Sequence, residues 1–154
     1  MPTLLRIFLL SLGSGALPLQ SQVVPVQANV DAQAQRRIQA DAQESTRRRR
    51  MEDNLRRLVS ALDPSILSGP NGPARTVQAM AAFADLLNDN LPPKQSIQQA
   101  LKKSPLEPSA TQKTSAYLLH CWNSLSERMT PEDLQAMRKG EEPKVPLNLP
   151  PYSP

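Results

Sequence analysis

The chain has 154 residues, with 18 lysines and arginines against 14 acidic residues, and a formal net charge of +4 at pH 7. This length suits a single domain, and one histidine with one cysteine excludes multi-histidine or cysteine-rich metal sites and any internal disulfide. Aromatic residues make up only 3% of the chain and no alternating β-branched run is present, so the composition predicts helices and disfavours a sheet.

The first 28 residues have the pattern of a secretory signal peptide. Arg6 precedes an apolar run from Ile7 to Leu19, and the segment closes on Val26-Gln27-Ala28, a site that signal peptidases accept. We therefore expect cleavage after Ala28 and a periplasmic or secreted product. The alternative is an apolar arm that stays attached and packs on the domain. The apolar run is well short of the roughly 20 residues that cross a bilayer, so no transmembrane span is predicted.

A long first helix is predicted from Asp31 to Leu62, ended by Asp63-Pro64 because proline disfavours helix at the residue before it. Only its last turns have an apolar stripe that can face a core. Residues 29–50 are therefore expected to project from a helical domain at residues 51–140, to fray, or to await a partner. The stripe consists of Met51, Leu55, Leu58, Val59 and Leu62.

Four consecutive arginines, Arg47 to Arg50, are the most conspicuous charged feature of this helix. Consecutive helical residues lie 100° apart, so the four surround the helix and do not line one side. Together with Arg56 and Arg57, however, Arg49 and Arg50 fall opposite the apolar stripe, on a face expected to be exposed. The candidate residues for contact with an anion or a partner are Arg36, Arg37, Arg47, Arg48, Arg49, Arg50, Arg56 and Arg57.

Three interpretations of these arginines are open. They form a solvated face, neutralised in part by acidic residues at i, i+4 spacing; or they attach the helix to an anionic membrane or envelope polymer; or Arg47 to Arg50 is a processing site in a secreted precursor. Nucleic acid is disfavoured because no aromatic residue is interleaved with the arginines to stack on bases. The expected i, i+4 pairs are Glu44–Arg48, Glu52–Arg56 and Asp53–Arg57.

Further helices follow a loop of turn-forming residues at 63–73. They are expected at Ala74–Asn90, Pro93–Lys103 and Ser109–Met129, and in a short element that starts at Thr130-Pro131 and stops at Gly140. Ser109 and Gln112 fit a capping box for the third of these. The predicted fold is all-α, a small irregular bundle of about five helices with one long N-terminal helix.

The C-terminal residues 141–154 include five prolines and are expected to be extended and disordered. The alternative is a short proline-rich ligand for an aromatic groove, with Tyr152 as its anchor.

No catalytic, cofactor-binding or metal-binding residues are predicted. His120 and Cys121 are adjacent, which on a helix points them about 100° apart, and Cys121 is expected to be buried. Glu132 and Asp133 are explained by a helix start, and Glu141 with Glu142 by a solvated tail. The sequence thus predicts an exported non-enzymatic protein that acts through contacts with an unknown protein partner, with attachment to an anionic surface or processing at the arginine run as alternatives.

Overall fold

The computed structural model describes the backbone of residues 3–154 and the side chains of residues 27–154. Every regular element in this part of the chain is an α-helix, which confirms the predicted all-α class. The chain divides into two compact units, residues 1–46 and residues 47–154. Helix α1 (Thr3–Ala61) belongs to both, because the boundary falls within it.

In the first unit, the side chains of residues 27–46 are exposed, apart from half-buried Ala32 and Glu44. The predicted signal peptide falls almost entirely outside the residues whose side chains are described, so cleavage after Ala28 stays a prediction. The projection of residues 29–50 from the domain also stays a prediction.

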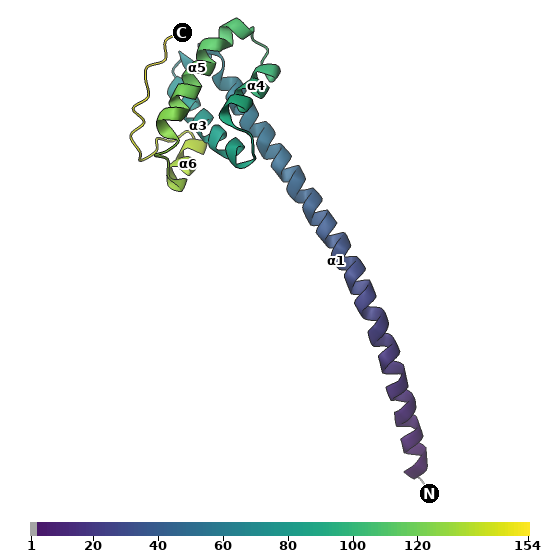
Figure 1. Ribbon diagram of the computed structural model, residues 1–154. Helices are drawn as coiled ribbons and strands as arrows, with labels where there is room; N and C mark the ends of the chain where they lie inside the picture. The colour runs from purple at the N-terminus through teal and green to yellow at the C-terminus, as the bar shows by residue number, and fades with distance from the viewer. Residues whose placement is uncertain (1–2) are drawn as a thin grey trace. The chain divides into compact units, whose positions relative to one another are not determined.

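The second unit contains the end of α1 and five further helices (Figure 1). Helix α2 lies within the stretch that was predicted to be only a loop. Asp63, expected to end the first helix, also caps this extra turn by accepting a hydrogen bond from the Ser65 amide at 2.9 Å. The helices are α2 (Pro64–Leu67), α3 (Gly72–Asn88), α4 (Pro93–Lys103), α5 (Pro108–Leu125) and α6 (Pro131–Arg138).

Helix α3 is the centre of this unit and contacts α2, α4, α5 and α6. Phe83 is completely buried and meets Trp122 of α5 edge to face, with ring centroids 5.7 Å apart. Leu87, near the end of α3, is 45% exposed although it is a large apolar residue. Four buried alanines allow the neighbouring helices to approach α3 closely: Ala79, Ala81, Ala82 and Ala84.

The predicted apolar stripe at the end of α1 is confirmed. Leu55, Leu58 and Leu62 are buried in the core, with Met51 and Val59 packed at its edge. Helix α5 adds buried Leu118, Cys121 and Leu125. The end of α1 and α5 are further joined by a hydrogen bond of 2.8 Å from the Thr114 hydroxyl to the Leu62 carbonyl.

The predicted helix starts are correct at α6 and wrong at α5. At α6, Thr130 and Asp133 form a reciprocal capping box, and Gly140 follows the helix with a φ of 76°. The capping box expected at Ser109 and Gln112 does not form, because α5 already begins at Pro108. Proline is preorganised for the first helical position and lacks the amide that a cap would satisfy.

The proline-rich tail is extended, as expected, but it is packed on the domain where disorder was expected. Leu147, Leu149 and Tyr152 contact the core cluster. The Tyr117 hydroxyl donates a hydrogen bond of 3.0 Å to the Pro150 carbonyl, and its ring meets Tyr152 edge to face at 5.2 Å. The tail therefore covers part of α5.

Asp133 joins the start of α6 to the beginning of this tail. Its carboxylate accepts hydrogen bonds from the Thr130 hydroxyl at 2.8 Å and from the amides of Thr130, Lys144 and Val145. These bonds, led by the one from the Thr130 side chain, hold the pKa of Asp133 below its ordinary value of 3.8. The charged form is therefore favoured in the folded protein.

The substitution Asp133→Asn is expected to lower the free energy of unfolding at neutral pH and to have a smaller effect in acid. A carboxylate with a lowered folded-state pKa stabilises the fold above its unfolded pKa, about pH 4, and loses this contribution as the pH falls through the folded value. Urea unfolding from neutral pH to about pH 2 measures this difference. Glu132→Gln, at the exposed neighbouring residue, is the control. An Asp133→Asn deficit that is constant over this range would contradict the assigned role.

Candidate functional site

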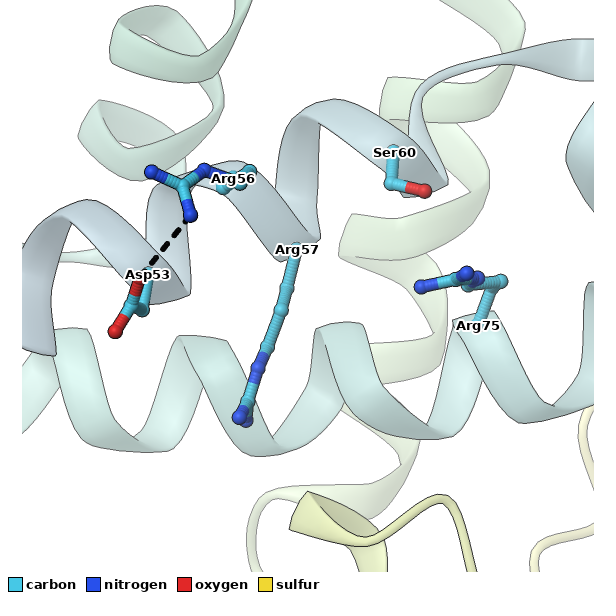
Figure 2. A pocket seen from close by; sticks show the side chains of 5 residues that line it. All are labelled: Asp53, Arg56, Arg57, Ser60 and Arg75. Carbon is cyan, nitrogen blue, oxygen red and sulfur yellow. Dashed lines mark hydrogen bonds and ion pairs between the residues drawn. The ribbon is translucent and has the colours of Figure 1, made fainter.

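A hollow of about 380 Å³ lies between the last turns of α1 and the beginning of α3 (Figure 2). Its lining is mostly charged. Arg56, Arg57 and Asp53 come from α1, together with the hydroxyl-bearing Ser60, and Arg75 comes from α3.

Arg57 and Arg75 extend into this hollow from opposite helices. In Figure 2 the Arg57 side chain runs from α1 over α3, and the Arg75 side chain starts on α3 and lies in the space between the two helices. Arg57 makes no hydrogen bond or ion pair with any residue in the described part of the chain. Arg75 donates one long hydrogen bond of 3.4 Å to the Gln78 side chain. Both arginines are half-buried, and their guanidinium groups retain unused donors.

Arg57 lacks a carboxylate partner because Asp53 pairs with a different arginine. The Asp53 carboxylate lies 3.4 Å from Arg56, at i, i+3 spacing, and both side chains are mostly exposed. The expected pairs Asp53–Arg57 and Glu52–Arg56 do not form among the described residues. Acidic neighbours on α1 therefore neutralise less of the positive charge of Arg56 and Arg57 than the i, i+4 spacing predicted.

A second hollow, also of about 380 Å³, lies on the other side of Arg56. It is lined by Glu52, Arg56 and Val59 of α1 and by Lys103 at the end of α4. Arg56 borders both hollows. We call the two hollows together the basic groove.

Two arginines of the run at 47–50 have a structural role that the sequence analysis did not anticipate. Arg50 binds Asp89 through two nitrogens, at 2.7 and 3.3 Å, and Arg47 lies 3.6 Å from the same carboxylate. Asp89 is only 8% exposed, directly after α3. The hydrogen bond that Arg50 donates to the Asp89 carboxylate raises the pKa of Arg50. Arg50 is exposed, as its face was expected to be, but its pairing with Asp89 was not expected.

The remaining candidate arginines are exposed and line neither hollow: Arg36, Arg37, Arg48 and Arg49. Sequence reasoning missed Arg75 and Lys103, which complete the groove. Lys103 stands in the last turn of its helix, where a cation is favourable without any ligand, and Arg75 carries no signal in the periodicity of its own helix. Only the packing of α3 and α4 beside α1 brings these cations together.

The groups considered for catalysis lie elsewhere. Cys121 is buried as predicted, and its burial raises the thiol pKa, while the adjacent His120 is exposed. Burial, with Cys121 nearby, raises the pKa of Tyr117 to about 12. Within residues 27–154, no three histidine, cysteine or acidic side chains are grouped to hold a metal ion. The raised pKa disfavours the reactive thiolate form of Cys121.

No helix in the described part of the chain combines the length and apolar character needed to span a membrane. The fold and the groove thus define a small all-helical domain with a basic recess on its surface. Comparisons with protein-family models, curated proteins and solved structures find no match. The function is therefore inferred from the residues and their geometry.

The substitution Arg50→Ala is expected to lower the melting temperature, whereas Arg49→Ala should leave it nearly unchanged. Both changes remove one positive charge and add a better helix former to α1, but only Arg50→Ala leaves the buried Asp89 without its forked partner. Thermal unfolding followed by circular dichroism measures the two midpoints. Equal shifts in both variants would show that the pair with Asp89 does not stabilise the domain.

Proposed function

We propose that residues 47–154 form a non-catalytic binding domain for ligands that carry phosphate or sulfate groups. The observation that carries this proposal is that Arg57 and Arg75 line one hollow, each with unused donors. A guanidinium group is planar and presents paired donors that match the oxygens of such anions. The Ser60 hydroxyl adds a donor at the same hollow.

The position of Arg75 supports a role in ligand binding. It lies in the first turn of α3, where the helix dipole favours anions and disfavours a cation. That turn contains no acidic residue, and its cap makes no side-chain hydrogen bond. A bound anion would relieve this unfavourable arrangement, because it would neutralise Arg75 and interact well with the dipole.

The side chains that line the groove favour some classes of anionic ligand over others. Neither hollow has an aromatic side chain on which a base could stack, which disfavours single-stranded nucleic acid. An exported domain, as the sequence predicts, would instead meet anionic polymers or surfaces of the cell envelope. The processing alternative gains no support, because residues 47–50 are helical and Arg47 and Arg50 are held by Asp89, whereas proteases prefer exposed loops.

A second candidate function is binding of a protein partner by the helical segment at residues 27–46. Val30 is 60% exposed and Ile38 68% exposed, although both are large apolar residues. They lie within about 80° of each other around the helix, at 100° per residue. A partner helix that covered this face would bury apolar surface that the segment cannot bury by itself.

The double substitution of Arg57 and Arg75 by glutamine is expected to weaken pyrophosphate binding to the full chain by about tenfold or more, since hydrogen bonds to charged groups contribute on the order of 1.5–3 kcal/mol each. Titration calorimetry at low salt and at about 0.15 M measures this, and binding should weaken with salt. The matched control replaces Arg36 and Arg49, which line neither hollow. Equal loss in both variants would mean that affinity follows net charge and not the groove.

For the second candidate, Ile38→Asp is expected to abolish capture of a specific partner from an envelope fraction, whereas Gln39→Asp should preserve it. Both changes add the same charge, but Gln39 lies on a different side of the helix from Val30 and Ile38. Quantitative mass spectrometry of the captured proteins compares the variants with the unchanged chain. An identical partner profile in all three would exclude this face as the contact.

A further inference from the structure

We infer that the ligand of the basic groove is a linear polyanion that occupies both hollows at once, with successive phosphate or sulfate groups on either side of Arg56. This inference rests on the proposed function and specifies the ligand class of the same site. It follows from the way three helices share the groove.

The two hollows are continuous in their lining because Arg56 borders each of them. On one side of it, Arg57 and Arg75 belong to the hollow between α1 and α3. On the other side, Lys103 belongs to the hollow between α1 and α4. The cations therefore form a series from α3 across α1 to α4, and a chain with regularly spaced charges can follow this series.

A single anion would use only part of this series. One phosphate group bound between Arg57 and Arg75 would occupy the hollow that Lys103, on a different helix, does not line. A linear chain gains affinity from the second hollow because its next group is already held nearby.

The acidic residues of the groove modulate this binding and do not prevent it. Asp53 borders the first hollow and Glu52 the second, against four cationic side chains in total. The Asp53–Arg56 pair is long and solvent-exposed, so it contributes little and yields readily to a stronger anionic partner. Arg56 can then turn toward a ligand.

A membrane surface fits this geometry less well than a flexible chain. The cations line recesses between helices, whereas lipid headgroups lie in a plane. Leu87 is the only large apolar residue of the domain at 47–154 that is strongly exposed, and it lines neither hollow. The surface thus provides no apolar cluster beside the groove for insertion into a bilayer.

The test measures binding of the full chain to orthophosphate, pyrophosphate and long-chain polyphosphate by titration calorimetry. Polyphosphate is expected to bind about tenfold or more tightly than pyrophosphate, per site. Lys103→Gln should remove most of that gain and leave orthophosphate binding unchanged. Lys102→Gln is the matched control, because this exposed neighbour has the same charge and lines neither hollow. Asp53→Asn should raise the affinity for polyphosphate, since it releases Arg56.

The outcomes distinguish the inference from the proposed function. If all three phosphates bind but Lys103→Gln and Lys102→Gln behave alike, the second hollow is not used and the inference is wrong, while the proposed function stands. If none of the phosphates binds, the proposed function and the inference fail together. Tight binding to phosphatidylglycerol vesicles with weak binding to polyphosphate would also overturn the inference, in favour of a membrane surface.

Discussion

Helix α3 is enclosed by the rest of the domain at 47–154, and this burial constrains everything packed around it. Its four buried alanines let α2, α4, α5 and α6 approach closely, while Phe83 and Met80 fill the larger spaces. Complete burial of one such large side chain contributes about 1.5–3 kcal/mol. In a chain with few aromatics, close packing around α3 therefore replaces the large ring cluster that other small domains use.

The same enclosure determines which arginines are structural. The two carboxylates near the end of α3 are shielded from solvent, so each requires a cationic partner. Asp89 takes Arg50 and Arg47, and Asp85 takes Arg138 of α6. These pairs neutralise both shielded carboxylates. Arg56 and Arg57, nearer the end of α1, therefore have no carboxylate partner on α3. The basic groove thus contains cations that these shielded carboxylates do not pair with.

The helices could be predicted from the sequence because their signals are local. Pro64, Pro93 and Pro131 all occupy first helical positions, and the Thr130–Asp133 box and Gly140 are complete within a few residues. The groove could not be predicted in the same way. Arg57 and Lys103 are far apart in sequence, and periodicity within one helix does not show which residue of another helix lies beside it. The pair between Arg50 and Asp89 was missed for the same reason.

The tail illustrates a different limit of sequence reasoning. Its proline content correctly predicts an extended backbone without internal hydrogen bonds, but composition does not reveal whether another surface supplies contacts. Here the surface is α5, where Tyr117 is placed to bind the Pro150 carbonyl. In the sequence, Asp133 is accounted for by its place at the start of a helix. Its carboxylate also accepts hydrogen bonds from the backbone amides of Lys144 and Val145, in the tail.

The basic groove lies on rigid elements, which affects how it can work. Its cations come from α1, α3 and α4, and all three helices contribute residues to one hydrophobic core. The spacing between Arg75, Arg57 and Lys103 is therefore set by core packing and not by loop conformation. The proposed binding of an anion would need little ordering of the backbone, so less of the binding free energy would be lost to entropy. In the proposed function, a groove held this way would select ligands by the spacing of their charges, whereas an arginine-rich flexible segment would accept any dense anion.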